Sequence, residues 1–270
     1  MANIKAMGSL SNKLLNFIST TLVHDSNYDI ALILLKNYGK LKKMSIAEVA
    51  DLCYVSQASI SRFCRFIGFD NFKEFKQSLE QDFSIANDYS RQFYAMLCSD
   101  EKMAIATYRD EMIGNIYSTL SPENMEIVPD IIKAIHDSKQ VACFSHHFLW
   151  DICRFFQSKM MVMGKYVEQF LDYNAQLECA RSLTPDSLAI ICSVGGSYIT
   201  RYTDIWDAIE ASGCTILVIT QNLSSPYLNS ARFVLRCGES NRDDIGKYAA
   251  MMATDILVIN YMKRYDKRIG

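Results

Sequence analysis

The hydrophobic periodicity changes near Gln140, and this change constrains the fold more than any other feature of the sequence. Five short apolar runs follow, separated by stretches of helical periodicity: VACFS, YVEQFL, LAIICSV, TILVIT and FVLRC. Apolar runs of this length that alternate with helices are typical of buried strands in a parallel sheet. The first 80 residues show helical periodicity only. The sequence therefore predicts an all-α N-terminal domain joined to an α/β C-terminal domain with a central parallel sheet.

The chain of 270 residues has room for two domains. We expect a helical domain over residues 1–80, a helical linker over 81–124 and the α/β domain over 125–270. The first segment carries a formal charge of +3 and the remainder −5, so the N-terminal domain is the better match for an anionic partner. The sequence shows neither an apolar run that could span a membrane nor a secretory signal. We therefore expect a cytoplasmic protein.

The nine cysteines are scattered without a CxxC pair, and most lie within apolar runs. This placement indicates buried thiols in a reducing compartment, and it argues against a disulfide framework or a zinc site. His146 and His147 are adjacent, but no carboxylate or third ligand lies near them in the sequence. We expect no metal and no cofactor.

Residues 45–67 have the pattern of two short helices that cross at a tight turn. Ser45 with Glu48 three residues later is a capping box for the first helix, and Ser56 can cap the second. The apolar positions of both helices interlock, and Ala50 is small where the helices would cross closely. This spacing is that of a helix-turn-helix, whose second helix lies in the major groove of DNA.

The polar residues of this motif are left facing outward and are the candidate DNA contacts. Glutamine and arginine can pair with adenine and guanine edges, and a helix N-terminus attracts phosphate oxygens. The expected DNA-binding residues, including two lysines from the preceding turn, are Lys42, Lys43, Ser56, Gln57, Ser59, Ser61, Arg62 and Arg65. Tyr54 departs from the pattern, because many such turns have glycine there. The alternative is a small helical packing unit whose polar face is only solvated.

The stretch SIAEVADLCYVSQASISRFCRFIGFDNFKEFKQSL resembles the N-terminal domain of the RpiR-type bacterial transcriptional regulators. The matching positions are Ile46, Glu48, Ala50, Val55, Ser56, Ile60, Arg62, Phe63, Arg65, Gly68, Phe69, Phe72, Phe75 and Lys76. The resemblance implies a DNA-binding regulator, of sugar-metabolism genes in particular. It also implies that the C-terminal domain is a sugar isomerase (SIS) domain, a parallel α/β fold that binds phosphosugars and mediates oligomerisation.

The two phosphate-binding loops depart from this family. After the first strand the family has G-x-G-x-S, whose glycines let the backbone approach a phosphate; the corresponding positions here are Ser145, His147 and Leu149. After the third strand the family has S-x-S-G-x-T, and this chain has SVGGSY over 193–198. Two interpretations stay open: the domain senses a phosphosugar or related anion, or it has lost ligand binding and only dimerises.

If a ligand binds, the expected contacts are Ser145, His146, His147, Ser193, Gly195, Gly196 and Ser197. The rival class of protein is an SIS-fold sugar-phosphate isomerase. We do not expect an enzyme, because an isomerase has no use for a DNA-binding domain and the substrate loops are altered. The expected protein is a transcriptional regulator with double-stranded operator DNA as its partner. It should be a homodimer or homotetramer, because specific binding usually needs two half-sites.

Overall fold

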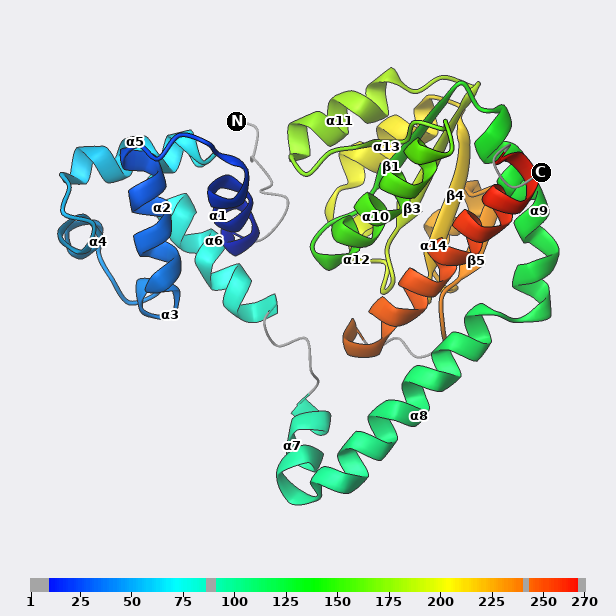
Figure 1. Ribbon diagram of the computed structural model, residues 1–270, viewed down its shortest axis with the longest axis horizontal. Helices are drawn as coiled ribbons and strands as arrows, with labels where there is room; N and C mark the ends of the chain where they lie inside the picture. Colours follow the sequence, from blue (N-terminus) through cyan, green and yellow to red (C-terminus); the bar gives the residue numbers. More distant parts are fainter. Residues whose placement is uncertain (1–9, 86–90, 240–242, 267–270) are drawn as a thin grey trace. The chain divides into compact units, whose positions relative to one another are not determined.

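The computed structural model describes residues 10–85, 91–239 and 243–266, which fold into two compact units (Figure 1). The N-terminal unit is all-helical. Its helices are α1 (Leu10–Thr20), α2 (Ser26–Lys36), α3 (Tyr38–Leu41), α4 (Ile46–Leu52), α5 (Gln57–Phe66) and α6 (Phe72–Ile85). Apolar side chains from most of these helices meet in one core, which includes Leu14, Leu34, Leu41, Val49, Phe63 and Phe75.

The caps expected for α4 and α5 are present. The Glu48 backbone N–H donates to the Ser45 hydroxyl at 3.3 Å, and the Ser45 N–H donates to the Glu48 carboxylate at 2.7 Å. The Ser56 hydroxyl accepts from the Ser59 N–H at 3.1 Å. Ala50 is 2% exposed in the unit formed by these helices, as its small side chain predicted. The helix-turn-helix geometry is therefore confirmed.

The C-terminal unit is an α/β domain. Its elements are α7 (Arg91–Ser99), α8 (Glu101–Thr119), α9 (Pro122–Asp137), β1 (Gln140–Phe144), α10 (Phe148–Val162), β2 (Glu168–Gln169), α11 (Tyr173–Ser182), β3 (Ser187–Cys192), α12 (Ser197–Arg201), α13 (Thr203–Ala211), β4 (Thr215–Thr220), the 3-10 helix η1 (Pro226–Ser230), β5 (Phe233–Arg236) and α14 (Asp243–Tyr265). Each of the five apolar runs contains a strand, so the predicted fold class is confirmed.

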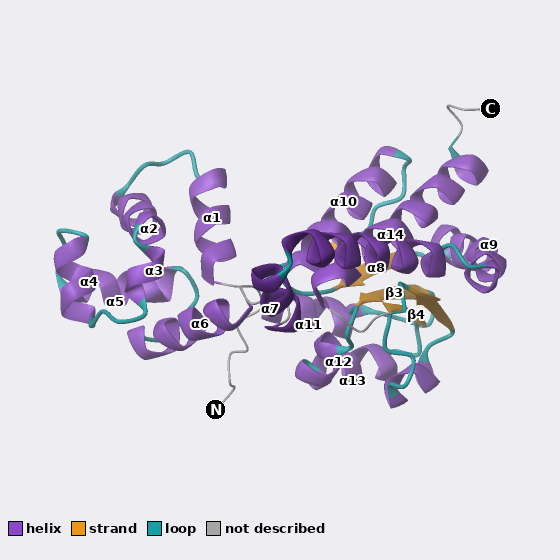
Figure 2. Cartoon of the chain, turned by 90° about the horizontal axis from the view of Figure 1, so that it is seen from below, coloured by secondary structure: helices purple, strands orange, loops and turns teal. Residues whose placement is uncertain are grey.

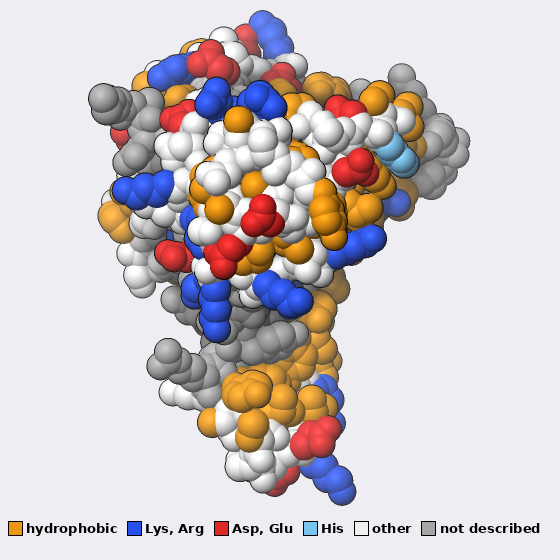
Figure 3. All heavy atoms as spheres, turned by 90° about the vertical axis from the view of Figure 1, so that its left-hand side faces the viewer, with side chains coloured by type: hydrophobic (Ala, Val, Ile, Leu, Met, Phe, Trp, Pro, Cys, Tyr) orange, Lys and Arg blue, Asp and Glu red, His pale blue; other side chains and the backbone are white. Residues whose placement is uncertain are grey.

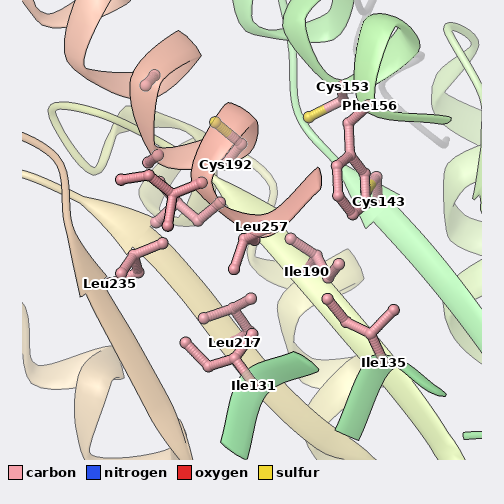
Figure 4. Packing of buried hydrophobic residues seen from close by; sticks show 14 of the residues in the cluster. Ile131, Ile135, Cys143, Cys153, Phe156, Ile190, Cys192, Leu217, Leu235 and Leu257 are labelled. Carbon is pink, nitrogen blue, oxygen red and sulfur yellow. The ribbon is translucent and has the colours of Figure 1, made fainter. Parts of the chain in front are cut away.

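The five strands form one parallel sheet in the order β2-β1-β3-β4-β5. Alternate residues of β1 show how both faces are buried: Val141 and Cys143 face α9, α10 and α14, whereas Ala142 and Phe144 face α11, α12 and α13. Figure 2 shows α12 and α13 on one side of β3 and β4, with α10 and α14 on the other. The first of these two cores is drawn in Figure 4, where the labelled residues are Ile131, Ile135, Cys143, Cys153, Phe156, Ile190, Cys192, Leu217, Leu235 and Leu257.

Helices α7 and α8 fall within the segment expected as a linker. Helix α8 packs along α14 and α7 packs against α8, so both belong to the C-terminal unit. The Tyr108 and Tyr248 hydroxyls, 3.4 Å apart, join α8 to α14. The domain limits at 80/81 and 124/125 stay predictions. Across the described residues, the helices lack the uninterrupted apolar length that crossing a bilayer requires.

We predict that Ala50→Leu destabilises the N-terminal unit by about 1–3 kcal/mol, because the added carbons overpack a closely packed site. Thermal unfolding of the full chain measures the effect. Ala58→Leu is the matched control, since Ala58 is exposed on the neighbouring helix α5. An Ala50→Leu variant with the melting temperature of the control would contradict the close packing of α4 on α5.

Candidate nucleic-acid interface and ligand crevice

Helix α5 presents one apolar and one polar face. Ile60, Phe63 and Cys64 are buried, whereas Arg62 and Arg65 are exposed. The remaining predicted DNA-binding residues also reach the surface of this unit: Lys42, Lys43, Ser56 and Gln57 are exposed, and Ser59 and Ser61 are half-buried. Arg62 donates through Nη2 to the Ser59 hydroxyl at 2.9 Å, and the Ser56 and Ser59 hydroxyls lie 3.0 Å apart. Ser56, Ser59 and Arg62 therefore form one polar cluster on α5.

The basic turn before α4 is held by a lysine that the sequence indicated only as a family match. The Lys76 ammonium donates to the carbonyls of Leu41, Lys42 and Met44 at 3.2, 2.6 and 2.7 Å. These bonds satisfy carbonyls at the end of α3 and fix the backbone on which Lys42 and Lys43 stand. Lys76 is thus a positioning residue for the two exposed lysines.

The connections of the sheet define one place where a crevice should form. From β1 the chain crosses to β2 on one side, and from β2 it returns to β3 on the other side of β1. In open α/β sheets, ligands bind at such a switch point, beyond the carboxyl ends of the two strands. The loop after β1 contains Ser145, His146 and His147, and the loop after β3 begins at Ser193. The structure therefore brings the predicted ligand-binding loops to neighbouring positions.

The first loop turns its polar groups inward. The Ser145 side chain is buried, and its hydroxyl has no hydrogen-bond partner in the part of the chain that the structure describes. Leu149, at the position of the family's serine, packs against the apolar core. His147 has φ of +52°, a conformation that glycine adopts most easily, and its ring meets that of His146 with 4.4 Å between centroids.

His146, in the first loop, is 6% exposed. Its ring stacks on Tyr198 with 5.6 Å between centroids, and it meets Tyr202 edge-on at 5.7 Å. Burial, together with smaller electrostatic effects of His147 and Arg201, lowers the pKa of His146 to about 3. His146 is therefore neutral near pH 7 and brings no positive charge to the crevice.

Hydrogen bonds within the chain already use the polar groups of the second loop. The Ser193 hydroxyl is fully buried and accepts from the Tyr198 backbone N–H at 3.1 Å. The Tyr198 hydroxyl donates to the Gln176 side-chain carbonyl at 2.6 Å, and the Gln176 amide donates to the Ser145 carbonyl at 3.0 Å. Tyr198 and Gln176 thus tie the two loops together across the crevice.

The glycines of the second loop are also closely flanked. Gly196 has φ of +83°, and a Cβ there would lie 3.0 Å from Nδ2 of Asn222. The same amide donates to the Gly195 carbonyl at 3.4 Å. Of the residues predicted for this loop, Ser197 is exposed, and it is the first residue of α12. Ser197 is therefore the predicted second-loop contact that remains accessible to a ligand.

Sequence reasoning did not select Gln176, Tyr198 or Tyr202 as site residues. Tyr198 was visible as a departure, because it stands where the family has threonine. Gln176 lies on α11, 22 residues earlier, and nothing in the local sequence indicates its bond to Tyr198.

A hollow of about 390 Å³ opens at the opposite edge of the sheet. Its lining includes Lys139 before β1, Ser187 at the start of β3 and Thr215 at the start of β4. Its lysines are paired with carboxylates, as in the Lys139–Asp186 ion pair of 2.6 Å. This hollow is therefore separate from the switch-point crevice.

Comparison with known proteins identifies the N-terminal unit. Residues 14–86 match the family model described as the helix-turn-helix domain of the rpiR family. The N-terminal domain is an RpiR-family helix-turn-helix domain. No curated protein matches the sequence.

Solved structures resemble the chain at low identity. The Vibrio vulnificus NanR protein complexed with ManNAc-6P is 16% identical with a TM-score of 0.50, over 95% of this chain and 92% of that chain. A hypothetical protein is 16% identical with a TM-score of 0.51, over 60% and 90%. The sugar isomerase domain of an RpiR transcription factor from Sphaerobacter thermophilus is 18% identical with a TM-score of 0.48, over 60% and 92%. The NanR match extends from the RpiR-family domain through the α/β domain and supports the two-part fold.

We predict that His146 makes the folded state less stable in acid. Its folded pKa of about 3 lies below the ordinary 6.5, so the unfolded chain binds the extra proton between these values. The stability is complete above pH 6.5 and is lost as the pH falls; from pH 7 to 5 the loss is about 2 kcal/mol. His146→Phe should remove this part of the pH dependence, measured by urea unfolding at both pH values.

The same replacement at His136, an exposed histidine on α9, is the control. An unchanged pH dependence in His146→Phe would show that this ring does not lie protected in the crevice.

Proposed function

We propose that the protein is a transcriptional regulator that binds operator DNA through α5. We also propose that its SIS-type domain holds subunits together and does not bind ordinary sugar phosphates at the switch-point crevice. The observation that carries the first part is the exposed polar face of α5, set on a helix-turn-helix core of the RpiR family. Its Ser56 cap leaves an exposed N-terminal turn beside two arginines, which suits contact with phosphates and base edges.

The geometry of the crevice supports the second part. A bound phosphate needs free N–H and hydroxyl donors or a positive charge. Here the Tyr198 N–H already donates to the Ser193 hydroxyl, and His146 is neutral. The NanR structure contains ManNAc-6P, which carries a phosphate group, so a shared fold alone does not decide what this chain binds.

An isomerase is the second candidate, and the geometry argues against it. Proton transfer on a sugar needs a base within hydrogen-bond reach of the bound substrate. The His146 ring, in the loop after β1, is packed against Tyr198 and Tyr202. A helix-turn-helix domain also has no role in isomerase chemistry. We therefore propose a regulator that is not an enzyme.

Exposed apolar side chains support a homodimer or homotetramer. Figure 3 shows hydrophobic side chains gathered over α7 and α8, in the lower part of the face drawn. Tyr94, Met103 and Ile105 on these helices are each more than half exposed. Apolar clusters of this kind commonly mark contacts between proteins, and two copies would provide two recognition helices.

We predict that Arg62→Ala weakens binding to the operator and leaves the fold intact, because Arg62 is exposed. A guanine contact would cost about 1–3 kcal/mol at one base position. A phosphate contact would weaken binding to all sequences and lower the salt slope by about one. Fluorescence anisotropy with DNA from upstream of the protein's own gene measures both quantities.

Arg181→Ala is the control, since it removes an exposed arginine from α11 of the other unit. If Arg62→Ala and Arg181→Ala both bind with wild-type affinity, Arg62 is not part of the interface. If the wild-type chain binds no DNA, the proposed function is wrong.

We predict that common hexose and pentose phosphates do not shift the melting temperature of the wild-type protein. A ligand present at 100 times its Kd would stabilise the folded state by about 2.7 kcal/mol, so binding would be readily detected by thermal shift. Any ligand that does bind should be held mainly by Ser197, the exposed residue of the second loop. A shift with one of these compounds that Ser193→Ala abolishes would show that the crevice opens to phosphosugars.

A further inference from the structure

The turn between α4 and α5 has a backbone form that normally selects glycine. The Val55 N–H donates to the Ala50 carbonyl at 3.0 Å, and the Tyr54 N–H donates to the Asp51 carbonyl at 3.1 Å. These two bonds form a Schellman motif, in which the first residue beyond the helix cap is left-handed. That residue is Tyr54, with φ of +56°.

Other helix ends in the described chain with a left-handed residue use glycine. Helix α5 ends in the same two-bond pattern, Phe69 N–H to Cys64 O at 2.8 Å and Gly68 N–H to Arg65 O at 3.1 Å, with φ of +94° at Gly68. Gly164 after α10 and Gly213 after α13 also have positive φ. A Cβ at such a position crowds the following carbonyl oxygen, so a tyrosine there costs stability.

The Tyr54 side chain does not offset this cost by packing. It is 93% exposed. A glycine at this position would therefore make the folded state more stable. Strained residues of this kind cluster at functional sites, which indicates that the side chain contacts another molecule.

The position of Tyr54 indicates what it contacts. Tyr54 lies two residues before Ser56, the cap of α5, and so stands beside the end of the helix that carries Gln57 and Arg62. A phenol hydroxyl can donate to a phosphate oxygen, and tyrosine is among the side chains that bind DNA backbone. We propose that Tyr54 donates a hydrogen bond to a phosphate of double-stranded operator DNA beside the N-terminus of α5. This inference rests on the proposed function of the domain.

The test compares stability and DNA affinity in the full chain carrying Tyr54→Gly. Glycine removes the left-handed strain, so the melting temperature should be equal to or above that of the wild type. Operator affinity should fall on the order of tenfold to a hundredfold, the usual effect of losing a hydrogen bond to a charged group. The salt slope should stay unchanged, because a phenol releases no counterion. A residue with a purely structural role would not move stability and affinity in opposite directions.

Two further variants complete the experiment. Tyr54→Phe keeps the ring and should lose most of the same affinity, whereas Tyr166→Gly, at an exposed loop tyrosine of the other unit, should lose none. Wild-type affinity in Tyr54→Gly or Tyr54→Phe would overturn the phosphate contact and leave the proposed function standing. A lower melting temperature in Tyr54→Gly would overturn the argument from strain. Absence of DNA binding by the wild type would overturn both the inference and the proposed function.

Discussion

A parallel sheet must be buried on both faces, and most of the C-terminal unit follows from this constraint. The strands are apolar on both sides, so helices have to cover both, and each connection between parallel strands supplies one. Crossing first to β2 and then back to β3 places α10 on one face and α11 on the other. The same two crossings bring the ends of β1 and β3 together. The position of the crevice therefore follows from the chain connections that cover the sheet, whatever side chains line it.

What the chain does with that crevice depends on a few polar bonds. The line from Ser193 through Tyr198 and Gln176 to the Ser145 carbonyl joins the two loops. Buried polar groups need partners, and this line gives partners within the chain to the Ser193 oxygen, the Tyr198 hydroxyl and the Gln176 amide. The neutral ring of His146 packs beside this line, against Tyr198 and Tyr202.

The parts of the structure that the sequence predicted are those governed by local rules. The apolar runs predicted the five strands, and short polar side chains predicted the helix caps at Ser45 and Ser56. The pairing of α8 with α14 and the bond from Tyr198 to Gln176 join residues far apart in the chain. The hydrophobic periodicity of a sequence does not predict contacts between such distant residues. The departure at Tyr198 could be noticed from the sequence, but what its hydroxyl reaches depends on how α11 lies against α12.

The non-glycine residues with positive φ in the described chain are Tyr54 and His147, and each stands where a related pattern has glycine. In both places the backbone keeps the conformation suited to glycine while a large side chain has been added. At His147 the ring packs on His146, so the interior of the crevice offsets the strain. At Tyr54 the side chain extends into solvent, and nothing in the described chain offsets it. The two positions therefore differ in where the added side chain lies: the His147 ring packs against a neighbouring ring, whereas the Tyr54 ring is exposed on the surface of the helix-turn-helix.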